Sequence, residues 1–213
     1  MQIELVTWRI IGTRPLIQNR YDIPPDPVRE ADGEIKVAAR KRYVPKPRYE
    51  EAVKQLYVSD GRYFHPATAF WKSMIAAGEG RKFKSTRAPD VIARAVQVCE
   101  EEFWLLDPAT LDAKKPRPLG SKDWIVDCRS AVNYNCKPPA RIPVARPKWK
   151  SWGGLLTLEI ERDFFSDLNV LTEVLMIAGR FGIGAGRIRR EERGKQQVWS
   201  GCNCGKFVAE LKV

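Results

Sequence analysis

Three glycines at alternate positions, with arginines directly after them, form the stretch of this sequence best suited to contact another molecule. Gly182, Gly184 and Gly186 leave a backbone with little side-chain cover, which a second chain can approach closely. The cations that follow within nine residues are Arg187, Arg189, Arg190, Arg193 and Lys195. We interpret the stretch as a contact for an anionic backbone, with a plain helix-to-strand turn and a solvated basic loop as the alternative.

This glycine stretch matches neither of the common nucleotide-binding motifs. A dinucleotide fingerprint follows a strand and opens a helix, whereas here a helical pattern precedes the glycines and none follows them. A Walker loop contains Gly-Lys followed by Ser or Thr, and that run does not occur in the sequence. We therefore expect no cofactor.

A second basic segment lies between residues 22 and 48. Prolines come first and an acidic patch extends to Glu34. The cations that follow, with no acid between them, are Lys36, Arg40, Lys41, Arg42, Lys46 and Arg48. Tyr43 and Tyr49 are interleaved with them, as in single-strand binding, where charges follow phosphates and rings stack on bases. Such a stretch cannot build a core, so we predict an inserted arm or extended hairpin at about residues 20–50, with a solvated charged linker as the alternative.

A third group of cations surrounds a predicted helix from Ala67 to Ala77. Pro66 precedes this helix, where its missing N–H does not matter, and Gly78 begins the turn that ends it. A second basic loop follows at about residues 79–90. The further nucleic-acid candidates, including one that follows the first strand, are Arg20, Trp71, Lys72, Arg81, Lys82 and Lys84.

The tryptophans divide by their sequence neighbours. Trp8, Trp104 and Trp124 lie in predicted strands, so we expect them in the core. Others stand next to basic residues, and we expect some of these to contact a ligand: Trp71, Trp149, Trp152 and Trp199.

His65 is the one histidine of the sequence and the one residue suited to general acid–base chemistry near neutral pH. It lies at a predicted strand-to-helix junction, where it can simply bond to the backbone. General acid–base catalysis also needs a second positioned group, and the sequence indicates none. We therefore predict a protein that is not an enzyme, with a nuclease that uses His65 as the runner-up.

The cysteines offer a weak metal site. Four thiolates could come from Cys128, Cys136, Cys202 and Cys204, but zinc sites favour Cys-x2-4-Cys pairs, and these spacings match them poorly. We expect reduced thiols and no metal. Cys99 lies in an apolar predicted strand, so we expect it in the core.

The elements that must position these residues follow from hydrophobic periodicity. Strands are predicted at residues 2–10, 96–106, 154–162 and 207–213. Helices are predicted at Ala67–Ala77 and from an N-cap at Ser166 to Gly179. This order predicts an α/β (α+β) fold with a ferredoxin-like or RRM-like βαββαβ core, in which an antiparallel sheet carries two helices on one face.

Composition sets the broad class. The chain has 213 residues, 44% of them hydrophobic, which suits a single domain, residues 1–213, with insertions. Lys and Arg number 37 against 26 Asp and Glu, a net charge of +11 that favours a polyanionic partner. No apolar run approaches the length of a membrane span, and the first residues do not resemble a signal peptide. We predict a cytoplasmic protein with no membrane partner.

Several short runs together resemble a known family. They are Leu56-Tyr57 with Asp60-Gly61-Arg62-Tyr63, Pro66-Ala67 with Ala69-Phe70-Trp71-Lys72, Arg146-Pro147-Lys148-Trp149 with Trp152, and Ala178-Gly179-Arg180-Phe181-Gly182-Ile183-Gly184. Over most of residues 50–213 this pattern resembles a family of small proteins from bacteriophages and prophages. In element order, in the Phe64-His65-Pro66-Ala67 helix start and in the glycine stretch, it resembles the RAMP superfamily, in particular the repeated backbone subunit of class 1 CRISPR effector complexes.

The RAMP resemblance implies a ferredoxin-like palm with a thumb-like insertion, which coats single-stranded nucleic acid and polymerises along it. It matches Ala67–Lys72 to the helix whose start faces the nucleic-acid backbone. It also matches Gly182, Gly184, Gly186 and Arg187 to the glycine-rich loop, and the basic arm to the inserted thumb. RAMP endoribonucleases that process CRISPR transcripts often use a histidine, which is the role the runner-up reading gives to His65.

We therefore expect sequence-independent binding of single-stranded RNA, or single-stranded DNA, in a bacterial or phage-infected cell. The expected partners are the strand itself, further copies of the chain along it, and other subunits of a CRISPR-like or phage-encoded assembly with a role in antiviral defence. The alternatives are a RAMP-type endoribonuclease that uses His65, and a phage protein that mimics an effector subunit and binds it.

Overall fold

The computed structural model describes residues 2–20, 48–133, 140–185, 187–193, 196–201 and 203–212. The described helices are α1 (Arg48–Lys54), α2 (Thr68–Ala77), α3 (Ala88–Ala95) and α4 (Leu168–Phe181), with a 3-10 turn at Pro108–Thr110. The described strands are β1 (Ile3–Gly12), β2 (Leu16–Ile17), β3 (Val58–Ser59), β4 (Arg62–Pro66), β5 (Lys82–Phe83), β6 (Thr86–Arg87), β7 (Val96–Val98), β8 (Glu102–Trp104), β9 (Trp124–Asn133), β10 (Ala140–Trp149), β11 (Gly153–Glu161), β12 (Arg189–Arg193), β13 (Gln196–Ser200) and β14 (Phe207–Leu211).

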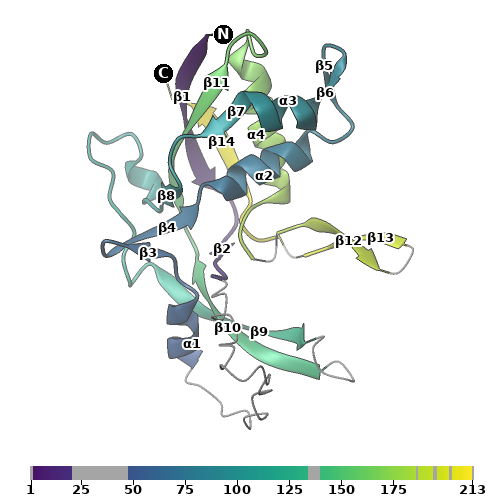
Figure 1. The fold of residues 1–213 in the computed structure, drawn as a ribbon. Helices are drawn as coiled ribbons and strands as arrows, with labels where there is room; N and C mark the ends of the chain where they lie inside the picture. Colours follow the sequence, from purple (N-terminus) through teal and green to yellow (C-terminus); the bar gives the residue numbers. More distant parts are fainter. Residues whose placement is uncertain are drawn as a thin grey trace, which may run out of the picture.

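A four-stranded antiparallel sheet, here called the central sheet, organises the fold. Its order is β14-β1-β11-β7, and every neighbouring pair is antiparallel. Figure 1 shows α2, α3 and α4 packed together on one side of it. Val6, Trp8 and Ile10 point to that helical side and are buried, because alternate residues of a strand face opposite sides of a sheet. The expected α/β class with antiparallel pairing is confirmed.

The helical layer is held tightly against the central sheet. The Ser73 hydroxyl of α2 donates to the Ala178 carbonyl of α4 at 3.2 Å. Gly179 lies so close to β14 that an added Cβ would stand 2.0 Å from the Phe207 carbonyl oxygen. Gly179 therefore serves this close packing. It does not end the helix as we predicted from the sequence, since α4 continues to Phe181.

Both ends of α4 lie at other residues than the sequence predicts. Asp167, and not Ser166, is the N-cap, and its carboxylate accepts from the Asn169 N–H at 2.9 Å. At the other end Gly182 has a φ of +83°, the conformation that lets a helix stop and that residues other than glycine rarely adopt.

The strand predicted at residues 96–106 is wrong as one element. β7 joins the central sheet beside β11, whereas β8 pairs with β4 in a separate three-stranded sheet with β3. Glu100 and Glu101 lie in the bend between the two strands. The apolar residues on either side of that bend therefore serve two different sheets.

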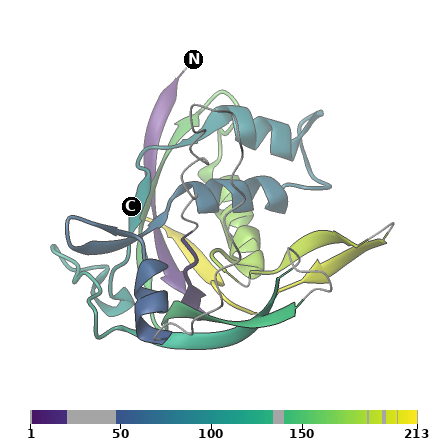
Figure 2. The same ribbon diagram turned by 60° about the horizontal axis from the view of Figure 1, so that its bottom comes forward.

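A second layer lies below the central sheet in the view of Figure 1. It consists of the sheet β2-β10-β9, with α1 packed on β10 and β9. Figure 2 shows β9 and β10 from their own side, with the β12–β13 hairpin projecting beside them. Of the predicted arm, residues 21–47 lie outside the described residues, and Arg48 begins α1.

The predicted basic loop at residues 79–90 contains a short hairpin, β5–β6, followed by α3. Among the described residues, no helix combines the length and the apolar character that crossing a bilayer requires.

Candidate nucleic-acid interface

The chain leaves β2 through three polar residues at the junction between the two layers. The backbone N–H of Gln18 donates to the Pro147 carbonyl of β10 at 3.1 Å, and its side-chain amide donates to the Phe64 carbonyl of β4 at 2.5 Å. Arg146 Nε donates to Asn19 Oδ1 at 2.8 Å. We call this junction the polar crossing and define it by Gln18, Asn19, Arg20, Tyr57, His65, Arg146 and Arg187.

The glycine stretch reaches the polar crossing from the end of α4. The Ala185 N–H donates to the Ile17 carbonyl at 2.7 Å, which fixes the stretch against β2. Gly184 has a φ of +72°, and a Cβ added there would stand 2.6 Å from the Ile17 carbonyl oxygen. The missing side chain therefore makes room for the protein's own backbone. Arg187 Nη1 donates to the Gly184 carbonyl at 3.2 Å, so the stretch also positions an arginine at the crossing.

His65 lies inside the polar crossing with 4% of its surface exposed. Its ring meets the Tyr57 ring edge-on at 5.7 Å between centroids. Burial, and secondarily the charge of Arg187, lowers the pKa of His65 from 6.5 to about 3. The imidazole is therefore neutral near pH 7 and has no proton to give as a general acid. Its Nδ1 is buried and has no hydrogen-bond partner among the described residues.

Gln18 adds a second unsatisfied polar atom to the crossing. This residue is fully buried, and its Oε1 has no hydrogen-bond partner among the described residues. Each unpaired buried polar atom lowers the stability of the folded protein. Good packing alone therefore does not explain why Gln18 and His65 both occur in this junction.

Three arginines from distant parts of the sequence lie at the polar crossing. Burial raises the pKa of Tyr57, and the charge of Arg20 opposes that shift. The charge of Arg187 acts on His65 in the same way as burial does. Burial also lowers the pKa of Arg146, and the first opposing influence is Asp127. The crossing is therefore a region of positive potential formed by side chains from three segments.

These positive charges are only partly neutralised. Asp127 pairs with Arg129 at 2.5 Å and with Lys148 at 3.4 Å, so the acid on β9 already has two cations. Within the part of the chain that the structure describes, neither Arg146 nor Arg187 forms an ion pair with a carboxylate. Both guanidinium groups can therefore take an anionic ligand without first giving up an acid.

The predicted binding residues do not form one cluster. Arg20 and Arg187 lie at the polar crossing, and Arg48 begins α1, which packs on β10. Arg81, Lys82 and Lys84 lie beyond the other end of α2, a helix of ten residues, or roughly 15 Å. Arg189 and Arg190 lie in β12. Predicted residues outside the described part of the chain are Lys36, Arg40, Lys41, Arg42, Lys46 and Gly186.

Two residues of α2 were predicted to contact nucleic acid. The indole N–H of Trp71 donates to the Val96 carbonyl at 2.8 Å, which fixes this half-buried ring against β7. Lys72 is exposed on the same helix.

The tryptophan predictions are right in part. Trp8 and Trp124 are buried, as expected. Trp149 and Trp152 are also fully buried, so neither is one of the tryptophans available to contact a ligand. Trp104, expected in the core, is half-buried and carries the Arg62 guanidinium 4.1 Å above its ring. The side chain of Trp199 lies outside the described part.

Cysteine placement overturns two expectations. Cys99 is exposed and not in the core, because it follows the last residue of β7 where the chain bends. Cys204 is disulfide-bonded, so it is not a reduced thiol. Cys128 is free and exposed on β9. A search of the described residues finds no group of three metal-ligating side chains.

Sequence reasoning missed Gln18, Asn19, Tyr57 and Arg146. Of these neighbours the sequence predicted only Arg20, after the first strand, and Arg146 belonged to a run that resembles a known family without an assigned role. Three successive polar residues directly after a strand were the available signal. Their contacts are made with β4 and β10, which lie more than 40 residues away in sequence, so the run alone does not show its role.

Neither a scan against protein-family models nor a search of the curated proteins finds a match for this chain. Function is therefore argued from the geometry and charge of the polar crossing. A cavity of about 710 Å³ lies elsewhere, against β1 and β11 of the central sheet.

Proposed function

We propose that this protein binds single-stranded nucleic acid, RNA in the first instance, without sequence preference. The observation that carries the proposal is the convergence of Arg20, Arg146 and Arg187 on the polar crossing, with Arg146 and Arg187 in no ion pair among the described residues. Arginines bind phosphate oxygens through paired N–H groups, and a net charge of +11 attracts a polyanion from a distance.

The half-buried ring of Tyr57 fits this proposal. Sequence-tolerant binding of single strands combines a cationic track with aromatic rings on which bases stack. The Tyr57 ring meets the His65 ring edge-on, and its hydroxyl, on which the charge of Arg20 acts, donates to the Asn19 carbonyl at 3.4 Å. An unpaired base stacked on this ring would bring its phosphates near the arginines.

The fold supports the same proposal. In chain order the central sheet and its helices run β1, α2 with α3, β7, β11, α4 and β14, and the sheet order is β14-β1-β11-β7. We infer a ferredoxin-like βαββαβ core from this order, with the β9–β10 layer and the arm as insertions. Because such cores host many functions, the proposal rests on the crossing and not on the fold.

We further propose that the protein acts as a repeated, non-catalytic subunit of a CRISPR-like or phage-encoded ribonucleoprotein. A buried imidazole with a pKa of about 3 does not favour acid–base cleavage by His65. The protein that mimics an effector subunit remains the alternative, and it predicts no affinity for nucleic acid.

The test is equilibrium binding of a short single-stranded homopolymer by fluorescence anisotropy at several salt concentrations. Each phosphate contact contributes a slope of about −0.7 to the dependence of log affinity on log salt. We expect a steep salt dependence and similar affinities for different homopolymer sequences. Affinity that does not change with salt, or no binding at low salt, would contradict the proposal.

A further inference from the structure

The face of the central sheet opposite the helices, here called the open face, is only partly covered. The loop after β8 covers one end of it, where Arg9 forms an ion pair with Asp112. At the other end Ile3 and Leu5 are 49% and 66% exposed. Exposed aliphatic side chains on a sheet face next to a cavity are typical of an interaction surface.

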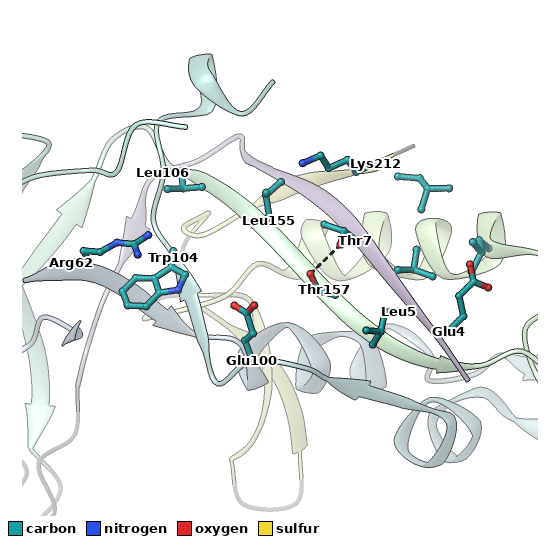
Figure 3. A pocket seen from close by; sticks show the side chains of 13 residues that line it. Glu4, Leu5, Thr7, Arg62, Glu100, Trp104, Leu106, Leu155, Thr157 and Lys212 are labelled. Carbon is teal, nitrogen blue, oxygen red and sulfur yellow. Dashed lines mark hydrogen bonds between the residues drawn. The ribbon is translucent and has the colours of Figure 1, made fainter. Parts of the chain in front are cut away.

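Figure 3 shows how the cavity lies against this open face. Leu5, Thr7 and Thr157 line it from β1 and β11, and the two threonine hydroxyls are hydrogen-bonded at 3.0 Å. Trp104, with Arg62 above its ring, and Glu100 line the opposite side. The surface is therefore a groove whose floor combines leucine and threonine side chains. Its charged lining has both signs, with Glu4 and Glu100 against Arg62 and Lys212.

One end of the groove, beside the bend between β7 and β8, is acidic in a protein that is strongly basic overall, and we call this end the acidic rim. Glu100, Glu101 and Glu102 follow one another in the chain, and Glu159 stands opposite Leu5 in the β1–β11 register. Burial raises the pKa of the neighbouring Cys99 thiol, and the charges of Glu159 and Glu100 raise it further. A negative potential repels phosphates, so the acidic rim is unsuited to a nucleic acid.

A surface of opposite charge lies on the helical side of the same molecule. The β5–β6 hairpin and the residue before it carry exposed cations at Arg81, Lys82, Lys84 and Arg87. Of these, Arg87 has an acid partner, Asp90, at 3.9 Å. Figure 1 shows the hairpin beyond α2 and α3, so the helical layer lies between it and the open face of its own chain.

We propose that the open face of one copy binds the β5–β6 hairpin of the next copy. The acidic rim and the basic hairpin are complementary in charge and lie on opposite sides of the molecule. Contact between unlike surfaces is head-to-tail and repeats from copy to copy. The proposal rests on the proposed function in one respect, since such an array suits a protein that coats a strand.

The first experiment uses two charge-reversed proteins, one with Glu100→Lys and Glu159→Lys, the other with Lys82→Glu and Lys84→Glu. Sedimentation velocity without nucleic acid, at low salt and rising protein concentration, measures their association. We expect wild type to associate and each reversed protein alone to remain monomeric, because like charges then face each other across the contact. An equimolar mixture should associate again, since every contact in it can join opposite charges.

The control is Glu173→Lys, which makes one charge reversal of the same kind on the exposed face of α4. This variant should associate like wild type. Association of either reversed protein alone, or no recovery in the mixture when both proteins melt like wild type, overturns the proposal.

A second measurement does not depend on variants. Cys99 is a free, exposed thiol beside the acidic rim, and Cys128 is a free, exposed thiol on β9. Alkylation of wild type, followed peptide by peptide, should slow at Cys99 by about tenfold as copies associate, with Cys128 unchanged, because an interface excludes water from its centre. Equal rates at Cys99 in dilute and concentrated protein overturn the proposal, even if a reversed protein fails to fold.

A third comparison separates this proposal from the proposed function. The affinity for a long homopolymer, which holds many copies, is divided by the affinity for a strand that holds one copy. This ratio should fall at least about tenfold in each reversed protein and recover in the mixture. Binding of the short strand without association overturns the interface alone, whereas association without any binding overturns the proposed function alone.

Discussion

The polar crossing and the acidic rim of the open face lie in one molecule and carry opposite charge. The crossing contains a buried histidine and arginines from three segments, and Arg146 and Arg187 have no acid partner among the described residues. On the open face, glutamates border exposed aliphatic residues of β1. The net charge of +11 is therefore distributed unevenly over the molecule, so its size alone does not locate the nucleic-acid site.

The largest effect should follow from removing the two arginines that have no ion pair. Arg146→Ala with Arg187→Ala should weaken binding of a short single strand by roughly tenfold for each arginine and reduce the salt slope by about 1.4. Fluorescence anisotropy at three salt concentrations measures both. The control is Lys114→Ala with Lys115→Ala, which removes two exposed charges from the loop after β8. Equal losses in both double variants would show that only net charge matters and would remove the distinction between the two regions.

Gly184 should be needed for stability at the crossing. Alanine there would take a φ of +72° and place its Cβ 2.6 Å from the Ile17 carbonyl oxygen. Gly80 has a φ of +76° with no atom within 4 Å of such a Cβ, so it is the matched control. Gly80→Ala should cost about 1 kcal/mol from backbone strain alone. Gly184→Ala should cost roughly 2–3 kcal/mol or prevent folding.

Denaturant unfolding measures the difference between these two glycine variants. Equal losses in the free energy of unfolding would mean that the backbone of Gly184 moves away from Ile17 freely. The close packing of the glycine stretch against β2 would then not contribute to stability. From the sequence alone we expected Gly184→Ala to affect ligand binding. The position of the Ile17 carbonyl instead predicts a loss of stability.

A smaller effect concerns acid. The pKa of His65 is lowered from 6.5 to about 3 in the folded protein, so the unfolded chain takes up a proton there first as the pH falls. The contribution of His65 to the free energy of unfolding is fully present above pH 6.5. It declines as the pH falls toward 3, by about 1.4 kcal/mol per pH unit at most. His65→Gln should remove this decline between pH 6.5 and 5, where carboxylates titrate little. The same slope in both proteins would contradict the burial of the neutral imidazole.

The central sheet was predictable because its information is local. Alternation of apolar residues located β1, β11 and β14, and the apolar stripe of α4 indicated its buried face. The burial of Trp149 was missed because it follows Lys148 directly. Neighbours in a strand face opposite sides, so a lysine beside a tryptophan says nothing about the exposure of the ring.

The polar crossing was not predictable to the same extent. Gln18 acquires its role from the carbonyls of Phe64 and Pro147, and no pattern within its own segment encodes those contacts. The open face was missed because an exposed Leu5 within an alternating strand looks like any half-buried position. Leu5 is part of a groove only because Trp104 and Glu100, which are distant in sequence, line the same cavity.

The most direct test of the account is photo-cross-linking of a 4-thiouridine oligonucleotide to the wild-type protein, followed by peptide mapping. The account predicts adducts on peptides of the polar crossing, around Tyr57 and Arg146, and none on the open-face peptide that contains Cys99. Adducts concentrated on the Cys99 peptide or on β1, with the crossing unlabelled, would contradict it.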